Sequence, residues 1–390
     1  MASQHSGRAS VFYDPKIRGI FFQAVLFIAL AAFVWWITGN TVANLRRAHI
    51  ASGFGFLNGR AGFDVSNALI PYSSDSTMGR ALLVGLLNTL LVAMAGIVTA
   101  TVIGFLVGVG KLARNWLIRQ LCTVYIEIFR NIPPLLVIFF WYLGVLSVLP
   151  LPRNSIRFPL KMYLNSRGFY MPAPIWGEGA WLTGAGFLAG IALALTAARW
   201  ARRRQMTTGK RFPVLWASIV LIIGLPLVAF ALTGFPLSFD VPKASIFNLT
   251  GGIQVKPEFL SLYLALSFYT AAFIAEIVRA GILGVDRGQT EAAYSLGMTP
   301  GPTLRLVIVP QALRIIVPPL TSQYLNLTKN TSLAVAIGYA DLVAIGGTIL
   351  NQTGQAVEIV AIWMIVYLGI SLSVSVLMNW FNARMALTEK

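Results

Sequence analysis

Long apolar segments constrain this chain more than any other feature of its sequence. Crossing the roughly 30 Å hydrocarbon core of a bilayer takes about 20 residues of helix, and these segments approach or exceed that length. Because the sequence shows no strands that alternate apolar and polar residues, as a membrane β-barrel would, we expect an all-α polytopic membrane protein. We place eight transmembrane helices at about residues 20–38, 81–110, 125–149, 179–198, 213–235, 258–283, 312–340 and 356–382.

The composition agrees with a chain that is mostly surrounded by lipid. Of its 390 residues, 57% are hydrophobic and 11% are charged, whereas a soluble domain carries about 25% charge. The net charge of +17 raises the alternative of a nucleic-acid-binding protein. However, the basic residues flank the apolar segments and form no separate face with aromatic residues. Membrane orientation therefore explains the charge better than nucleic acid does.

Residue types that carry catalysis or hold metals are scarce. Cys122 is the one cysteine, and His5 and His49 lie outside every apolar segment, so we expect no disulfide, no metal site and no catalytic residue. The phosphate-binding pattern GxxxxGK[ST] does not occur, so we expect no cofactor in this chain and assign any ATP chemistry to another subunit. An enzyme embedded in the membrane is accordingly the weakest alternative.

Clustered arginines between the fourth and fifth spans give the clearest orientation signal. Residues 199–211 read "RWARRRQMTTGKR", and the positive-inside rule assigns such a short basic segment to the cytoplasm. Counting spans then predicts that both termini, and the stretch between spans six and seven, are cytoplasmic. We expect the first span to be a retained anchor, because its apolar run is longer than that of a typical signal peptide.

A polar stretch between spans six and seven, residues 287–314, has features of a short helix followed by a turn. Thr290 is the expected N-cap, and Glu291 lies in the first turn, where the helix dipole favours an anion. Ala292 and Ala293 would keep one surface shallow enough for another protein to approach. Gly297 would end the helix, and the prolines of "TPGP" would prevent further helix before the next span.

The spacing within this stretch resembles the EAA signature of ABC-importer permeases. Glu291-Ala292-Ala293 is followed by three residues, Gly297, nine residues, and Val307-x-Val309-Pro310; the family usually has Ile and Leu where this chain has the two valines. The resemblance implies a coupling helix that docks into a cleft of an ATPase subunit. The residues that it assigns to coupling are Gln289, Glu291, Ala292, Ala293, Gly297 and Pro310.

Three further segments, 88–142, 268–298 and 307–338, are similar to the polar-amino-acid permease family. The resemblance implies a type I importer permease core of five spans and transport of L-amino acids across a bacterial inner membrane. It also implies a sister permease in a heterodimer, two ATPase subunits and a periplasmic amino-acid-binding protein. Additions to the core would be residues 1–80, with one span and a periplasmic loop, and 151–256, with two spans; the core itself would be 81–150 and 257–390.

Charged and polar residues inside spans are costly, so we treat them as candidate functional residues. Glu276 and Arg279 are spaced to share a helical face, and they could pair, brace the cytoplasmic mouth or meet a zwitterion. Arg130 precedes Pro133-Pro134, and Arg314 precedes Pro318-Pro319; we interpret both stretches as gate or coupling braces, with simple anchoring at the membrane interface as the alternative. The full set of candidate gate or brace residues is Glu276, Arg279, Glu127, Arg130 and Arg314.

The segment "NLTKNTSL", residues 326–333, interrupts the apolar pattern of the seventh span. Polar backbone at membrane depth is tolerated where it faces protein or a water-filled path, so we interpret this segment as lining a substrate path. The alternative is that Lys329 snorkels and the hydroxyls cap a helix break. The family usually has Asp where this chain has Asn330. The candidate path residues are Asn88, Asn326, Lys329, Asn330, Thr331 and Ser332.

Two rival functions remain open at this stage. An ion-gradient-driven secondary transporter would use intramembrane acids such as Glu276, although it has no use for an EAA-like cytoplasmic segment. A structural subunit without a path of its own would have no use for the interrupted seventh span. Small-residue spacing at Gly104 and Gly108 indicates helix packing in preference to a pore.

Overall fold

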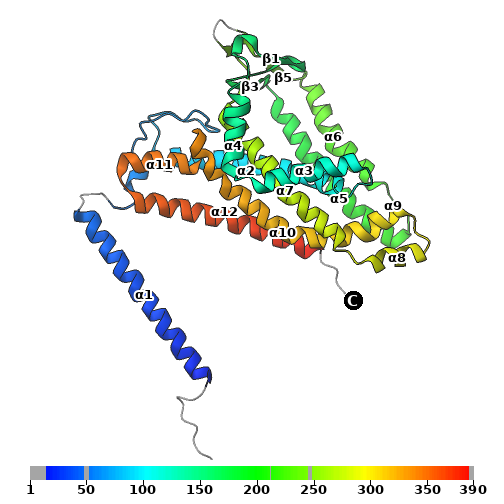
Figure 1. Cartoon of the computed structure of the whole chain (residues 1–390). Coiled ribbons are helices and arrows are strands. Elements are labelled where there is room, and N and C mark those ends of the chain that lie inside the picture. Colours follow the sequence, from blue (N-terminus) through cyan, green and yellow to red (C-terminus); the bar gives the residue numbers. More distant parts are fainter. Residues whose placement is uncertain (1–14, 48–51, 211, 245–247, 386–390) are drawn as a thin grey trace, which may run out of the picture. The chain divides into compact units, whose positions relative to one another are not determined.

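The computed structural model describes residues 15–47, 52–210, 212–244 and 248–385. Within these residues, seven helices are long and apolar enough to cross a membrane, or up to eight when one broken pair is counted as a span (Figure 1). The chain divides into two compact units, which we describe separately. The first joins the residues up to Asn131 with those from Leu266 onward, and the second is Ile132–Ala265.

Five long helices supply most of the first unit: α1 (Pro15–Arg47), α2 (Met78–Gly110), α7 (Pro257–Leu283), α10 (Val309–Asn330) and α12 (Ala356–Met385). Helix α7 begins in the second unit and enters the first at Leu266. The apolar window of α1 covers Arg18–Asn44, none of which is buried within the chain. The first span is therefore longer than the predicted 20–38, and its whole apolar surface is left to lipid or a partner.

Helices α2 and α7 pack at backbone distance through two glycines. A Cβ placed on Gly104 would lie 2.5 Å from Cγ2 of Ile274, and one on Gly108 would lie 2.6 Å from the carbonyl oxygen of Ala275. Side chains there would force the helices apart, which confirms the packing interpretation of this spacing.

An apolar core joins the first half of α2 to the short helix α11 (Leu342–Thr353) and the start of α12. Residues before α2, including the 3₁₀ helix η2 (Phe54–Asn58), cover this core. The covering segment is tied to α12, because the amide of Gly53 donates to Oε1 of Glu358 at 2.7 Å. The buried members of this core are Ala61, Met78, Ala81, Leu82, Val84, Leu342, Ile345, Ile349 and Ile359.

The third predicted span is not one continuous helix. Helix α3 (Trp116–Asn131) ends before Pro133, and α4 (Pro134–Phe139) begins after it and continues as the π-helix η3 (Phe140–Leu146). Proline lacks an amide hydrogen and disfavours the α conformation in the residue before it, so a Pro-Pro pair separates the two helices. The predicted span 125–149 thus also misses the first half of α3.

Small antiparallel sheets occupy part of the second unit, within the region 151–256 that the sequence analysis predicts as an addition to the core. The larger sheet has the order β1-β2-β3-β8, with Gly168 of β3 so close to Val255 of β8 that a Cβ would lie 2.1 Å from the carbonyl oxygen. Only glycine fits there, and its φ of +118° suits it. The strands are β1 (Ile156–Phe158), β2 (Met162–Asn165), β3 (Gly168–Met171), β4 (Ala173–Trp176), β5 (Leu237–Asp240), β6 (Lys243–Ala244), β7 (Leu249–Thr250) and β8 (Ile253–Val255).

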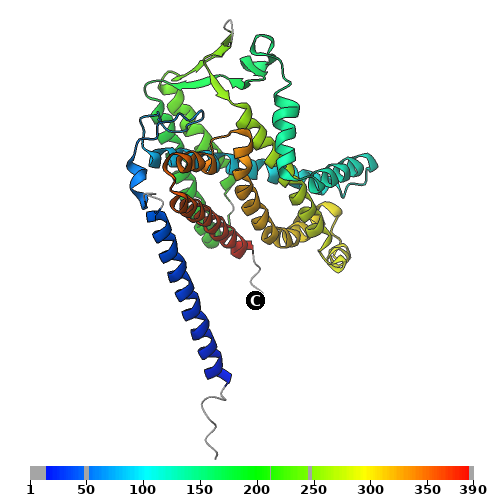
Figure 2. The same cartoon turned by 60° about the vertical axis from the view of Figure 1, so that its left-hand side comes forward.

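The remaining part of the second unit is a hairpin of helices α5 (Ala180–Thr208) and α6 (Val214–Leu232). Pairing of β4 with β5, and of β3 with β8, brings the two ends of this inserted region together at one end of the hairpin (Figure 2). Helix α5 extends ten residues beyond the predicted end at 198, so most of the basic stretch 199–211 is helix and not loop. Straight-chain residues such as arginine are good helix formers, and the helix ends only at Gly209 with φ +68°.

Candidate functional site: a surface helix and a polar line on α10

Helix α8 (Arg287–Ser295) forms where the EAA-like segment predicts a helix, with two local differences. Its N-cap is Asp286, whose carboxylate accepts from the amide of Gly288 at 2.6 Å, and Thr290 lies inside the helix. Asp is a strong N-cap residue and precedes Thr290, so it starts the helix earlier. Gly297 follows with φ +76°, which confirms that the helix ends in a turn suited to glycine.

The proline-containing segment after α8 is also helical, contrary to the expectation. Helix α9 (Pro300–Thr303) begins with proline at its first position, where the missing amide hydrogen has no partner to lose. It continues through the π-helix η6 (Leu304–Ile308) into α10, which holds Pro310 in its first turn.

The two alanines of the motif face opposite environments. Ala292 is exposed, whereas Ala293 is 3% exposed and belongs to the side of α8 that lies against its own chain, where α8 contacts α9 and η6. The expectation that both alanines form a docking surface is therefore wrong for Ala293. Successive helical positions differ by 100°, so adjacent residues cannot share one narrow face.

Apolar side chains that the sequence reasoning missed lie on the exposed side of α8. Leu296, the C-cap residue of α8, is 82% exposed and Tyr294 is 49% exposed, next to exposed Glu291. Gln289 is tied back to α10, because Nε2 of Gln311 donates to its Oε1 at 3.1 Å. Helix α8 thus presents apolar residues outward while a side-chain bond connects it to the helix that carries the polar line described next.

The predicted interruption of the seventh span coincides with a change of helix type. Helix α10 runs without a break through Pro318 and Pro319 and becomes the 3₁₀ helix η7 (Thr331–Ile337) at the polar segment. The hydroxyl of Thr331 donates to the carbonyl of Thr328 at 2.7 Å, and that of Ser332 donates to the carbonyl of Lys329 at 2.8 Å.

Exposure divides the candidate path residues into two groups. Asn326 and Lys329 are exposed on one face of α10, with Asn330 and Ser332 half-buried beside them; we call these four residues the polar line. Thr331 is fully buried. Asn88 is 1% exposed, and its side-chain amide donates to the carbonyls of Asn67 at 2.7 Å and Ala340 at 2.8 Å. The fold therefore gathers four of the six candidates on one accessible surface.

Of the candidate brace residues, Glu276 and Arg279 pair with each other as their spacing suggests, and Lys111 joins them. Glu276 receives hydrogen bonds from Nε of Arg279 at 2.9 Å and from Nζ of Lys111 at 3.1 Å. Lys111, at the end of α2, was missed because nothing in its local sequence indicates a partner 165 residues away. This ion group therefore links α2 to α7 near the C-terminal ends of both helices.

Glu127 and Arg130 lie on α3, where each has a different neighbour. The guanidinium of Arg130 lies 5.9 Å from the ring centroid of Phe273 on α7, and the backbone carbonyl of Glu127 accepts from the side chain of Asn131 at 2.8 Å. Arg314 lies half-buried on α10. Of the three, Arg130 connects two helices of the first unit, α3 and α7.

Asp341, between the seventh and eighth spans, is a titratable residue that the sequence reasoning missed. It is fully buried and caps α11, where its Oδ1 accepts from the amide of Ala344 at 2.8 Å, while its Oδ2 has no hydrogen-bond partner among the described residues. Burial raises the pKa of this carboxyl to about 7. The signal that was available is an Asp directly before an apolar helix, which is a typical N-cap.

Within the described residues, no group of three or more His, Cys, Asp or Glu side chains is arranged to hold a metal ion.

Residues 186–387 match the family model described as "Binding-protein-dependent transport system inner membrane component". The chain is 64% identical over 381 residues to the general L-amino acid transport system permease protein AapQ of Rhizobium johnstonii, covering 98% of this chain and 95% of that protein. It is 50% identical over 380 residues to the putative amino-acid ABC transporter permease protein YhdX of Escherichia coli, covering 97% of each.

Identity is 42% over 412 residues with the glutamate/glutamine/aspartate/asparagine transport system permease protein BztB of Rhodobacter capsulatus, covering 97% of this chain and 96% of that one. Among solved structures, a crystal structure of an amino acid ABC transporter with histidines aligns with a TM-score of 0.47 at 22% identity, over 78% of this chain and 94% of that chain. The family match and the near-full-length identities agree with the helical, multi-pass fold, and the chain is thus a member of the family of inner-membrane components of binding-protein-dependent transport systems.

Proposed function

We propose that this chain is the permease subunit of an ATP-binding-cassette importer that moves L-amino acids across the bacterial inner membrane. The family and the printed names of the long relatives support this function. An ion-gradient-driven secondary transporter, the rival function, finds no support among these relatives. The observation that carries the proposal is α8, a short surface helix with the EAA-like spacing that exposes apolar side chains.

In this proposal, α8 docks into an ATPase subunit, and that subunit binds and hydrolyses ATP. Exposed Leu296 and Tyr294 supply apolar contact area, Ala292 leaves room for the partner, and Gly297 makes the turn behind them. Closure of two ATPase subunits around ATP would displace α8. The Gln289–Gln311 hydrogen bond and η6 would then carry that displacement to α10.

The polar line on α10 is the proposed wall of the substrate path. Asn326, Lys329, Asn330 and Ser332 occupy an accessible surface of a helix that qualifies as part of a membrane span. A charged residue exposed to lipid is unfavourable, so we assign this surface to the interface with a sister permease, where water and substrate pass. Thr331 and Asn88 would support the wall from behind, since both are buried.

Orientation follows from the basic end of α5. The positive-inside rule assigns Arg199, Arg202, Arg203 and Arg204 to the cytoplasm, which puts α8 and both chain termini on the ATPase side. A periplasmic amino-acid-binding protein would then deliver substrate on the opposite side, and the full assembly would contain two permeases, here proposed as a heterodimer, and two ATPase subunits.

The docking role is tested by Ala292→Glu, with Ala68→Glu as a matched change at an exposed alanine outside α8. Each chain is purified with its partners, and native mass spectrometry counts the ATPase subunits that remain bound. We expect Ala292→Glu to retain the sister permease and to lose ATPase subunits by roughly tenfold, because a buried charge without a partner is costly at an interface.

Two results would contradict the proposal. Normal ATPase content together with unchanged amino-acid-stimulated ATP hydrolysis in Ala292→Glu would show that α8 is not the docking helix. A purified lone chain that accumulates amino acids with an ion gradient and without nucleotide would overturn the function itself.

A further inference from the structure

The α5–α6 hairpin has no role in the proposed coupling or in the proposed path, although it combines two features on one surface. One is an apolar groove between the helices, and the other is the dense cluster of arginines where α5 ends. Both lie in the second unit, so the structure defines the position of the groove relative to the arginines.

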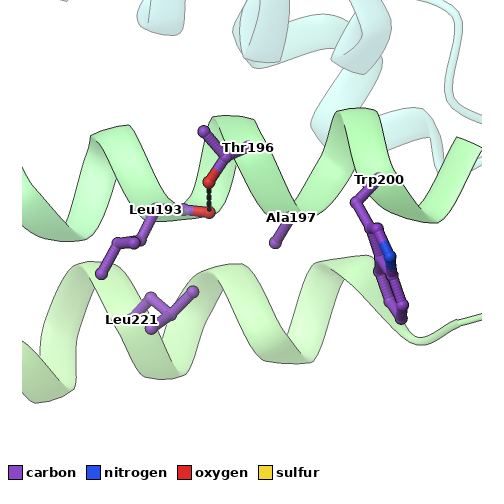
Figure 3. A pocket seen from close by; sticks show the side chains of 5 residues that line it. All are labelled: Leu193, Thr196, Ala197, Trp200 and Leu221. Atoms are coloured by element: carbon purple, nitrogen blue, oxygen red, sulfur yellow. Dashed lines mark hydrogen bonds between the residues drawn. The ribbon is translucent and has the colours of Figure 1, made fainter.

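The groove has a volume of about 380 Å³ and is lined by Leu193, Thr196, Ala197, Trp200 and Leu221 (Figure 3). The hydroxyl of Thr196 donates to the carbonyl of Leu193 at 2.9 Å within the helix, so it leaves the groove walls largely apolar. Both helices are long and apolar enough to be membrane spans, so an apolar groove between them is suited to contact with hydrocarbon in the bilayer.

Backbone contact on one side of the groove explains why it exists. A Cβ on Gly190 would lie 2.5 Å from the carbonyl oxygen of Leu221, so the helices touch there. Toward the turn, the ring of Trp200 meets Phe212 edge-on, with centroids 5.5 Å apart. Small Ala197 lies between these two contacts and fills little of the space.

The basic cluster begins where the groove ends. Residue 204 lies on the same helical face as 193, 197 and 200, and the guanidinium of Arg204 lies 5.1 Å from the ring centroid of Trp200. Exposed Arg202 and Arg203 flank it. The sequence between Glu178 and Asp240 holds six basic residues and no acidic one, namely Arg199, Arg202, Arg203, Arg204, Lys210 and Arg211.

We propose that the α5–α6 hairpin binds an anionic phospholipid, with an acyl chain in the groove and the headgroup phosphate against the arginines that follow Trp200. The occupant is set by charge and by shape. An acyl chain suits an apolar groove between two helices that are apolar enough to span the membrane, and a net negative headgroup would neutralise a cluster that contains no carboxylate. Arginine is well suited to phosphate, because its planar guanidinium can donate two parallel hydrogen bonds.

Lipid binding to the purified full-length chain, with any partners that accompany it, tests the proposal. Phosphatidylglycerol and phosphatidylcholine with identical acyl chains are titrated separately, and native mass spectrometry measures the fraction of protein that retains lipid. We expect preferential retention of phosphatidylglycerol in the wild type. We expect Arg202→Gln/Arg203→Gln/Arg204→Gln to weaken that retention by about tenfold or more, because each basic residue near a membrane surface adds to the attraction.

The control is Arg153→Gln/Arg157→Gln/Lys161→Gln, three exposed basic residues of the same unit near the small sheets. This triple variant should retain phosphatidylglycerol as the wild type does. Equal losses in both triple variants would show a general effect of charge and would overturn the site.

A second variant separates lipid binding from membrane orientation, which the arginines also influence. Ala197→Phe fills the groove and keeps every charge, so the chain inserts with its normal orientation, and we expect a comparable loss of phosphatidylglycerol. Unchanged retention in Ala197→Phe, or equal retention of phosphatidylcholine by the wild type, would contradict the proposal. ATPase co-purification should stay normal in Ala197→Phe, so this result is independent of the coupling function.

Discussion

At the scale of single residues, Ala292 and Ala293 show what a local sequence pattern predicts and what it does not. Both are helix-favouring residues in a segment that the EAA-like spacing predicts as a helix, and that helix is present. Their exposure differs completely, because the rotation of α8 about its axis is set by α9 and η6, which pack against it. The segment and its type were predictable, whereas the outward face was not.

Asp341 provides a pH-dependent prediction. Its folded-state pKa of about 7 exceeds the ordinary value of 3.8, so the folded protein binds more protons than the unfolded chain between these values. This carboxyl therefore stabilises the fold fully below about pH 4, and the stabilisation is lost as the pH rises through about 7. We expect the thermal midpoint of the solubilised protein to fall from pH 5 to pH 8, with a contribution on the order of a few kcal/mol.

Asp341→Asn should largely remove this slope, because the amide oxygen still caps α11 and does not ionise. The matched control is Asp75→Asn, whose carboxylate is exposed beside Arg60. The measurement is the thermal midpoint of each variant at several pH values. If the midpoint of Asp341→Asn depended on pH as steeply as that of the wild type, the assignment to Asp341 would be wrong.

Lys329 provides a test of the substrate path. Its ammonium is exposed on the polar line, so in the proposed path it would attract acidic substrates and repel basic ones. We expect Lys329→Gln to weaken competition by acidic amino acids by roughly twofold to fivefold relative to neutral ones, as for a partly screened charge pair. Competition uptake is the measurement, with Lys243→Gln as an exposed control in the other unit. An identical competition profile in Lys329→Gln and the wild type would refute the path-lining role.

At the scale of elements, the α5–α6 hairpin depends on glycine at one contact. Gly190→Ala would place a methyl group 2.5 Å from the carbonyl oxygen of Leu221, so the helices must separate, at a cost of about 1–3 kcal/mol. Gly184 lies on the same helix with nothing near its Cβ position. Gly184→Ala should therefore be neutral or slightly stabilising, because alanine favours helix.

Thermal unfolding of the two variants distinguishes packing from propensity. A lower midpoint in Gly190→Ala than in Gly184→Ala is expected. Equal midpoints would mean that the hairpin does not hold its backbone contact in the membrane.

The helices themselves were largely predictable, and the errors in their predicted bounds have identifiable causes. Apolar length indicates a span, but it does not show that α5 continues through polar arginines to Thr208. The predicted third span, 125–149, continues through Pro133-Pro134, although these two prolines separate α3 from α4. In contrast, Pro318-Pro319 leaves α10 continuous, so the same dipeptide has different outcomes in different surroundings.

At the scale of the whole molecule, we expect the hairpin to be removable without disrupting the rest of the chain. Trp176 of β4 pairs with Leu237 of β5, and the amide of Gly177 donates to the carbonyl of Pro236 at 3.0 Å, so the ends of the hairpin already meet. Replacing residues 177–236 by Asn-Gly would join the two strands through a two-residue β-turn. We expect the shortened chain to insert with its C-terminus on the same side as before, because two spans are removed.

The side of the C-terminus is measured by adding a single cysteine after the last helix. A membrane-impermeant thiol reagent then shows whether this cysteine is accessible. The parent chain with the same added cysteine is the control, and Cys122 is replaced by Ala in both. A C-terminus that changes sides would show that the hairpin contributes an odd number of crossings, contrary to the assignment of α5 and α6 as two spans.

The sequence by itself determined the membrane class, the helical nature of the spans and the position of the EAA-like segment. These properties are local, because the cost of placing polar groups in lipid and the spacing of a motif are read from consecutive residues. Only the tertiary structure decided that Lys111 joins Glu276, that Asn88 bonds to Ala340, and that Ala293 faces inward. Those outcomes depend on contacts between segments far apart in the chain, which no single stretch of sequence contains.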